Sequence, residues 1–464
     1  MMDAADPGLD RELDAPPSDS TLGRTDEEIG QFAEPPSLLE ERQPNTSWWA
    51  RMKGEMTRVT MHFPPSWFSV NMGTGITSVL LHEMPYQAQW LHYLSYIVFA
   101  LNVFLFVLFL GISIVRYARW PVLLRLLLRH PAQSMFLGTF SMGFSTIINM
   151  AVLVCVPRWG HGFTMFMWAL WWLNSAIALA MGVALPILQF TRHSHELSTV
   201  TGVLLLPVVT TVVIASTGAN VADVLPPNHA KLTLTVSYIL WGAGFCIAML
   251  CFALFYARLT IHKIPPAALI VTIFLPLGTC GQAAYGLLRF SAVINKLSVE
   301  SGQSLFGASE ATASEARIMA LALYGVTVPV ALIIWGLAFA WLIIAVGLLF
   351  DLWLVSKLTF NLGWWGFTFP IGTFTTATTQ LAKEFNSEAF RVLGTLFSII
   401  EILLWIAIGS LTFYRAVKGE IFVSPCLAET GGQPPKEAPF HRQYEYQPRF
   451  PRKQPAAQDL SSPA

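Results

Sequence analysis

Ten long apolar stretches alternate with short polar or charged connections along the chain. A membrane-spanning helix needs about 20 mostly apolar residues. Stretches of that kind lie at 66–85, 90–116, 132–156, 162–190, 201–221, 232–258, 267–290, 320–351, 364–383 and 389–414. Most of them end at proline, glycine or charged residues. The pattern predicts an all-α membrane protein with ten transmembrane helices.

The odd-numbered and even-numbered stretches differ in chemistry. Even-numbered stretches are dense in Leu, Phe, Ile and Trp, whereas odd-numbered ones carry Pro, Gly, Ser and Thr at similar places, as at 206–211, 275–282 and 369–376. Hydroxyls, and backbone N–H and C=O groups left without a helical hydrogen bond by proline, are disfavoured in contact with lipid, which cannot hydrogen-bond to them. One helical hairpin used five times, with the odd helices facing one another along a pathway, satisfies this constraint. The alternative is that the small residues only permit close helix packing.

Composition and charge support a membrane protein with polar tails. Hydrophobic residues make up 54% of the chain and charged residues 12%, against about 25% charged residues in soluble domains. Residues 1–45 hold twelve acids and three bases, which predicts a disordered acidic cytoplasmic tail. Residues 46–62 mix aromatic and basic side chains, and we expect either an interfacial segment or a simple positive flank. The transmembrane domain then covers 63–415, and the Pro-rich 416–464 forms a second cytoplasmic tail, mostly disordered.

Basic residues set the expected orientation. The connections after the even-numbered stretches, together with the two flanks, hold thirteen Lys and Arg against six on the other side. Basic residues favour the cytoplasmic side, so both termini should be cytoplasmic. The longest external loop should then be residues 291–316.

Two motifs carry a family resemblance. Pro-Ser-Trp-Phe-Ser-Val-Asn-Met-Gly-Thr-Gly-Ile opens the first stretch at 65–76, and Trp-Trp-Gly-Phe-Thr-Phe-Pro opens the ninth at 364–370. Over about residues 60–415 the chain resembles the tellurite-resistance/dicarboxylate transporter family. That family includes plant slow anion channels, fungal malate transporters and fungal sulfite efflux pumps, and the first motif is most similar to the sulfite pumps.

The resemblance implies an architecture and a gate. The five hairpins would stand in a pseudo-five-fold arrangement, with an inner ring of odd helices lining a pore, and three copies would form a homotrimer. Channel members close the pore with a phenylalanine of the ninth helix, for which Phe369 is the first candidate here and Phe367 the second. Phe369 precedes Pro370, and a residue before proline is pushed away from helical geometry, so we expect its ring to swing into the axis. The alternative is that Phe369 faces lipid or only packs against other helices.

The expected pathway holds hydroxyl and amide groups and almost no fixed charge. Such donors stabilise an anion and still release it, as would backbone amides freed near Pro207, Pro276 and Pro370. The competing interpretation for each hydroxyl is a bond to its own helix backbone. The candidate pathway residues are Ser69, Asn71, Thr74, Ser145, Asn149, Thr210, Thr211, Ser216, Thr279, Gln282, Thr373 and Thr376.

Glu401 is the one ionisable residue in the middle of a stretch. Intramembrane carboxylates are functional candidates, so it is a candidate for proton coupling, although the tenth helix should be an outer one. A membrane-embedded enzyme, the rival class, needs converging acid and base groups. We therefore expect no catalytic or metal site, no cofactor, no nucleotide-driven step and no nucleic-acid partner.

These observations predict a multi-pass anion transporter, and the family resemblance implies that it lies in the plasma membrane and exports sulfite or bisulfite from the cytoplasm. The partners would be a small inorganic anion and the lipid bilayer. A malate or dicarboxylate transporter, or a nitrate or chloride channel, remains the alternative within the family. A dicarboxylate would favour a fixed cation in the pore, and the nearest candidate, Arg289, stands near an outer end.

Overall fold

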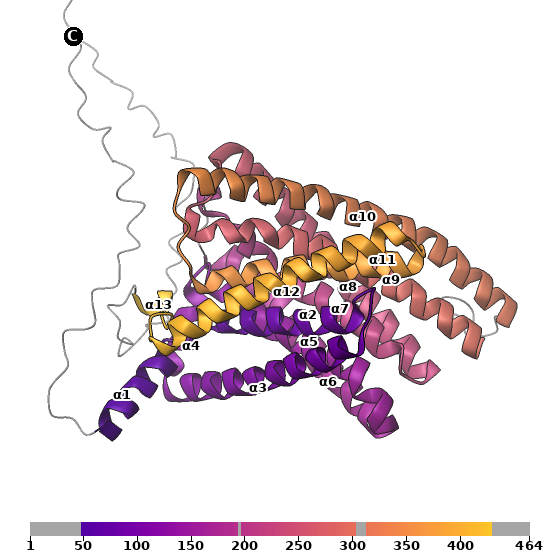
Figure 1. Ribbon diagram of the computed structural model, residues 1–464, viewed down its shortest axis with the longest axis horizontal. Coiled ribbons are helices and arrows are strands. Elements are labelled where there is room, and N and C mark those ends of the chain that lie inside the picture. Colours follow the sequence, from indigo (N-terminus) through magenta and orange to yellow (C-terminus); the bar gives the residue numbers. More distant parts are fainter. Residues whose placement is uncertain (1–47, 194–195, 303–311, 429–464) are drawn as a thin grey trace, which may run out of the picture. The chain divides into compact units, whose positions relative to one another are not determined.

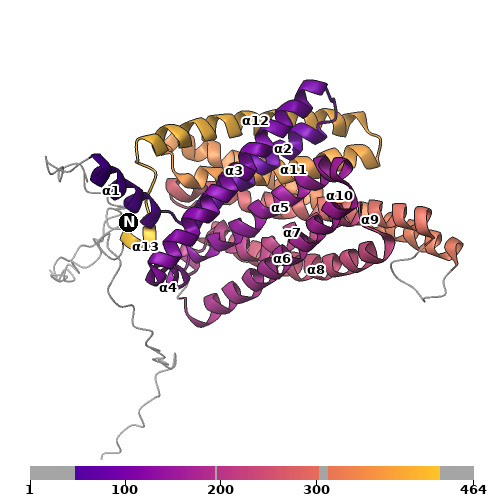
Figure 2. The ribbon, with the colours of Figure 1, turned by 90° about the horizontal axis from the view of Figure 1, so that it is seen from below.

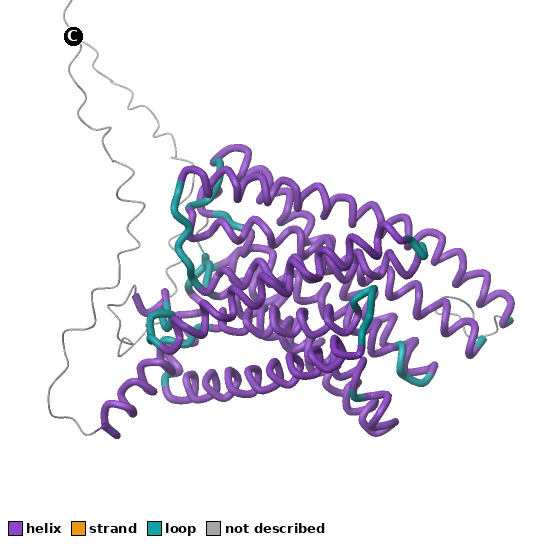
Figure 3. Tube along the Cα trace, viewed as in Figure 1, coloured by secondary structure: helices purple, strands orange, loops and turns teal. Residues whose placement is uncertain are grey.

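The computed structural model describes residues 48–193, 196–302 and 312–428, and within these ranges it contains helices and no strand (Figure 3). The predicted tail 1–45 lies outside the described residues, as does 429–464 of the predicted tail 416–464. Residues 416–428 of that second tail are described and contain the end of α12 at Val417 and α13 (Pro425–Ala428). The chain divides into two units, Met1–Met56 and Thr57–Ala464. Helix α1 (Trp48–Met61) occupies the segment expected at the membrane interface, and that location stays a prediction.

Helices stand at all ten predicted stretches in the second unit. Five of them begin after a short 3-10 turn: α2 (Phe68–Glu83), α5 (Gly138–Val154), α7 (Leu206–Ala222), α9 (Leu275–Ser301) and α11 (Trp365–Glu384). The other five are longer and return along them: α3 (Gln89–Arg119), α6 (Val156–Thr191), α8 (Pro227–His262), α10 (Ala313–Val355) and α12 (Glu388–Val417). The expected external loop at 291–316 is wrong in extent, because α9 continues to Ser301 and α10 starts at Ala313.

Burial separates the two sets of helices. In the most apolar 18-residue window, 94% of residues are buried for 202–222 and 78% for 267–301, against 22–28% for the five long helices. In Figure 1, α3 and α10 lie at opposite edges of the bundle, and in Figure 2, α12 and α8 do so. The long helices therefore present apolar side chains outward, as a lipid-facing surface requires.

Eight helical segments in the described part are long and apolar enough to cross a membrane. Helices α2 and α11 are not among them: α2 has 16 residues, and α11 carries a dense run of threonines. Both are almost wholly buried against other helices. Their polar composition is therefore shielded from lipid by the rest of the bundle.

The five buried helices contact one another in a closed cycle. Helix α2 contacts α5, α5 contacts α7, α7 contacts α9, α9 contacts α11, and α11 contacts α2. The 3-10 turns that precede them meet in the same cyclic order: η1 (Pro65–Trp67), η2 (Ser134–Leu137), η4 (Gly202–Leu205), η5 (Ala267–Phe274) and η6 (Leu362–Trp364). The five helices therefore start together at one end and run in the same direction.

Prolines start these helices more often than they interrupt them. Pro207 and Pro276 occupy the first turn of α7 and α9, where the missing N–H has no intrahelical partner to lose. Pro370 lies inside α11, yet the helix is continuous from Trp365 to Glu384. Backbone amides freed by a break in the helix are therefore not found at Pro370, whereas Pro207 and Pro276 lie where a 3-10 turn passes into an α-helix.

Small connecting elements complete the described chain: α4 (Pro121–Arg129), η3 (Leu197–Thr199) and α13 (Pro425–Ala428). Arg116, near the end of α3, holds the segment before α2. Its guanidinium is buried and donates to the carbonyl oxygens of Met61 (3.1 Å) and Phe63 (2.6 Å). This contact fixes where the chain enters the first buried helix.

Candidate anion pathway

A cavity of about 250 Å³ lies within the ring of buried helices. All five of those helices contribute to its wall. Its polar and charged lining comprises Glu83, Thr146, Asn149, Asn220, Asp223, Gln282, Tyr285, Arg289, Thr376, Thr379, Gln380 and Lys383. The rest of the lining is apolar and consists of Ile76, Val79, Leu153, Val213 and Phe369.

On α2, α5 and α7 the cavity is lined from about the middle of the helix to its end, on α9 by the middle, and on α11 by most of the helix. On α11 its first lining residue is Phe369 and its last is Lys383. At 1.5 Å per residue these positions are about 21 Å apart along the helix. The ring of Phe369 therefore marks the end nearer the helix starts, and charged side chains mark the other end.

The two candidate gate residues have different surroundings. Phe369 lines the cavity, whereas Phe367 does not. Phe367 packs edge-on against Phe274, with ring centroids 4.9 Å apart, and against Trp364 at 5.9 Å. Helix α11 is continuous through Phe369. The ring of Phe369 therefore reaches the cavity because it shares a helix face with Thr376, seven residues later, and not by the expected departure from helical geometry.

Three predicted polar residues line the cavity together with Phe369: Asn149 from α5, Gln282 from α9 and Thr376 from α11. Asn149 donates to Thr217 Oγ1 at 3.1 Å and accepts from Asn220 Nδ2 at 3.0 Å. The amide of Asn149 is thus fixed in orientation at the cavity wall.

Most of the other predicted hydroxyls bond a backbone carbonyl of their own helix or of the turn before it, and they do not line the cavity. Thr210 donates to Pro207 O (2.5 Å) and Thr279 to Leu275 O (3.1 Å). The same holds for Ser69, Ser145, Thr211, Ser216 and Thr373. For these residues the structure favours the simpler interpretation, a local bond that satisfies the hydroxyl inside the helix.

Asn71 and Thr74 face outer helices. Asn71 Nδ2 donates to both the backbone and the side-chain oxygen of Asn102 on α3, at 3.1 and 3.0 Å. Thr74 accepts from Trp405 Nε1 of α12 at 3.1 Å. Both residues are buried, and these contacts connect α2 to its outer neighbours.

Glu401 is fully buried between α12 and α2 and does not line the cavity. Its Oε1 accepts from Thr77 Oγ1 at 2.9 Å, while its Oε2 has no hydrogen-bond partner among the described residues. The contact joins an outer helix to an inner one. Glu401 stays an untested candidate for proton coupling.

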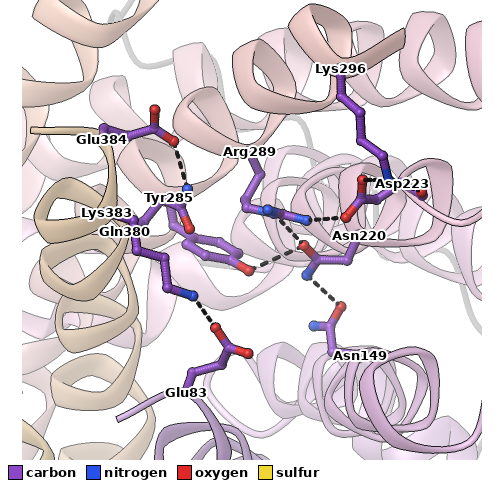
Figure 4. A network of polar contacts seen from close by, with 10 residues as sticks. All are labelled: Glu83, Asn149, Asn220, Asp223, Tyr285, Arg289, Lys296, Gln380, Lys383 and Glu384. Atoms are coloured by element: carbon purple, nitrogen blue, oxygen red, sulfur yellow. Dashed lines mark hydrogen bonds and ion pairs between the residues drawn. The ribbon is translucent and has the colours of Figure 1, made fainter. Parts of the chain in front are cut away.

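Arg289 anchors a network at the charged end of the cavity (Figure 4). Its Nη2 lies 3.0 Å from Asp223 Oδ2, and its Nε donates to Asn220 Oδ1 at 2.9 Å. Tyr285 Oη donates to the same Asn220 oxygen at 3.2 Å, and Lys296 Nζ lies 2.9 Å from Asp223 Oδ1. Burial alone would raise the pKa of Asp223, but Arg289 and Lys296 together lower it below its ordinary value.

A second ion pair joins α2 to α11 (Figure 4). Lys383 is paired with Glu83, and both line the cavity. Beside it, Gln380 Nε2 donates to Glu384 Oε1 at 2.7 Å. The expectation of a pathway almost free of fixed charge is therefore wrong at this end, where two cations and two carboxylates line the wall.

The sequence contained a signal for part of this charged end. Tyr285 and Arg289 follow Gln282 by three and seven residues, and Gln380 and Lys383 follow Thr376 by four and seven. Residues at these spacings share one face of a helix. Extending the predicted polar face toward the helix ends would have included them.

Comparison with known proteins identifies the family. Residues 62–413 match the family described as voltage-dependent anion channel. The chain belongs to this family. It is 44% identical over 362 residues to a sulfite efflux pump of Arthroderma benhamiae, covering 78% of this chain and 92% of that protein.

More distant members differ in the transported anion that their names give. A sulfite efflux pump of Candida albicans is 31% identical over 360 residues, 73% of this chain and 71% of that protein. A malic acid transport protein of Schizosaccharomyces pombe is 26% identical over 377 residues, 81% of this chain and 83% of that protein. The family and these relatives support a multi-pass anion transporter.

Proposed function

We propose that this protein exports sulfite or bisulfite from the cytoplasm across the plasma membrane. The observation that carries the proposal is the 44% identity to a sulfite efflux pump over 92% of that pump's length. The cavity adds a route for a small anion, because it is enclosed by all five buried helices and presents amide, hydroxyl and guanidinium donors. An inside-negative membrane drives anion exit with about 2.3 kcal/mol per charge per 100 mV, so export needs no ATP.

The proposed architecture is ten transmembrane helices in five hairpins, with α2, α5, α7, α9 and α11 as the pseudo-five-fold inner ring of a pore. The closed cycle of contacts among these helices supports it. Phe369 is the proposed gate, supported by its place at the end of the cavity. Both termini are cytoplasmic in this proposal, with 63–415 in the membrane, 46–62 at its inner surface and two tails in the cytoplasm.

The second candidate substrate is malate or another dicarboxylate. Two cationic side chains, Arg289 and Lys383, line the cavity, and a malic acid transport protein is among the relatives. Each cation is paired with a carboxylate, however, so the wall offers a dianion little uncompensated positive charge. This balance favours the small inorganic anion.

The decisive experiment is flux from purified protein in liposomes without ATP. Sulfite, malate, nitrate and chloride would each be loaded under an imposed potential, and protein-free liposomes would serve as the control. Sulfite flux that exceeds malate flux and follows the potential supports the proposal. Flux of malate alone, or flux that appears only with ATP, would contradict it.

Topology and assembly need separate measurements. A single cysteine placed between α9 and α10, in a background without the five native cysteines, should react with a membrane-impermeant reagent from outside the cell. Labelling only after permeabilisation would overturn the proposed orientation. The proposed homotrimer predicts cross-linked species up to three copies and no larger.

A further inference from the structure

Arg289 has donor capacity left after its contacts within the protein are made. A guanidinium has five N–H donors, and here Nε and Nη2 bind Asn220 and Asp223. No hydrogen-bond partner of Nη1 lies among residues 48–193, 196–302 and 312–428. The side chain lines the cavity and is 21% exposed. An oxyanion in the cavity can therefore reach this guanidinium.

Asp223 binds the same guanidinium that a permeating oxyanion would bind. Its Oδ2 lies 3.0 Å from Arg289 Nη2, and its Oδ1 is held by Lys296. The carboxylate belongs to the residue that follows α7, so it cannot diffuse away as a free anion can. Asp223 occupies Nη2 and offsets the charge of the guanidinium. An oxyanion that binds Nη1 therefore shares Arg289 with a carboxylate already bound to it, and is held less strongly than by an unpaired arginine.

We infer that Asp223 is a tethered competitor for Arg289 that keeps anion binding in the cavity weak enough for release. This inference rests on the proposed function and assigns a role within that same cavity. The lining charges of Arg289, Lys383, Asp223 and Glu83 balance. A balanced wall disfavours a dianion more than a singly charged oxyanion such as bisulfite, because removing a dianion from water costs more and no excess of positive charge offsets that cost.

The test removes the competitor without changing its size. Asp223→Asn should lower the sulfite concentration at half-maximal flux about tenfold, since one charge-assisted competitor of Arg289 is lost. Maximal flux should fall, because the anion leaves more slowly. Sulfate, a dianion, should inhibit the variant more strongly than the original protein. Glu388→Gln is the matched control, because it removes an equal charge from an exposed residue bonded to Tyr86 and Arg391, outside the cavity.

A double-mutant cycle separates competition from a general gain of positive charge. If Asp223 acts through Arg289, the effect of Asp223→Asn should disappear in an Arg289→Gln background. The inference would be overturned if Asp223→Asn lowered the sulfite concentration at half-maximal flux equally with and without Arg289, or if Glu388→Gln lowered it by the same factor. So would an unchanged half-saturation in Asp223→Asn while the original protein transports sulfite. Absence of sulfite flux in the original protein would instead refute the proposed function.

A second variant keeps the inference testable if Asp223→Asn does not fold. Lys296→Gln releases Asp223 Oδ1 from its other partner, so the carboxylate should bind Arg289 more strongly. The sulfite concentration at half-maximal flux should then rise, again only where Arg289 is present. A fall, or a rise that persists in Arg289→Gln, would overturn the inference.

Discussion

Truncation of Phe369 gives the sharpest test of the proposed gate. A large apolar ring in a narrow pathway blocks ions because water leaves the constriction. Phe369 occupies the end of a cavity whose other lining side chains are mostly polar. Phe369→Ala should widen and wet this point and raise sulfite flux severalfold, while the protein still folds.

Phe367→Ala is the matched control, because it removes the same side chain two residues away. Phe367 has two aromatic contacts, with Phe274 and Trp364, each contributing about 0.5–1.5 kcal/mol beyond area burial. No aromatic ring contact of Phe369 occurs among the described residues. We therefore expect Phe367→Ala to destabilise the protein by about 1–3 kcal/mol more than Phe369→Ala does.

The assay is flux normalised to folded protein, with thermal unfolding measured for both variants in the same detergent. The expected result is higher flux and the smaller loss of stability in Phe369→Ala, with unchanged or lower flux in Phe367→Ala. A flux increase in neither variant would refute a phenylalanine gate. An increase only in Phe367→Ala would refute the assignment to Phe369.

Three further predictions follow from single contacts. Gly281→Ala places a Cβ 2.7 Å from the backbone of Phe374 and should destabilise the α9–α11 contact by about 1–3 kcal/mol. Gly336→Ala, with open space around it, should not destabilise the protein, and equal thermal stability of the two variants would contradict this prediction. Glu401→Gln keeps an acceptor for its threonine partner and lies away from the cavity, so sulfite flux and its pH dependence should not change; a shifted pH profile would instead support proton coupling. Because two basic partners lower the pKa of Asp223, its ion pairs should stabilise the protein fully above about pH 4 and lose that effect as pH falls through the lowered pKa. The original protein should therefore be more stable than Asp223→Asn at neutral pH, and equal stability of the two proteins near neutral pH would contradict this.

The pattern of apolar and polar residues was sufficient to predict the helices and their two classes. All ten predicted stretches are helical, and those rich in hydroxyls and glycine are the buried ones. The reason is physical, since a helix such as α7 needs protein neighbours on all sides if it is not to expose polar groups to lipid. The ends of the helices were less predictable. Helix α9 continues to Ser301, eleven residues beyond the end of the predicted stretch 267–290.

Side-chain direction within the site was not predictable from the sequence. Asn71 and Asn149 were equal candidates, yet Asn71 contacts α3 and Asn149 lines the cavity. The difference depends on the rotation of each helix about its axis, which is set by packing with distant helices. Asp223 and Arg289 were missed as a pair because 66 residues separate them and only the contact between α7 and α9 brings them together.

The ring of five 3-10 turns has an electrical consequence. Because the buried helices start there together, their macrodipoles are parallel, each equivalent to roughly +0.5 elementary charge at the helix start and −0.5 at its end. The inner ring therefore contributes a polarity along the cavity axis, attractive to an anion at the helix starts and repulsive at the ends. The outer helices run in the opposite direction but lie farther from the cavity, so they offset this polarity only in part. Arg289, Lys296 and Lys383 stand near those negative ends, where they offset the repulsion. With identical solutions on both sides, currents of opposite sign should still differ in size, since the protein itself is electrically asymmetric.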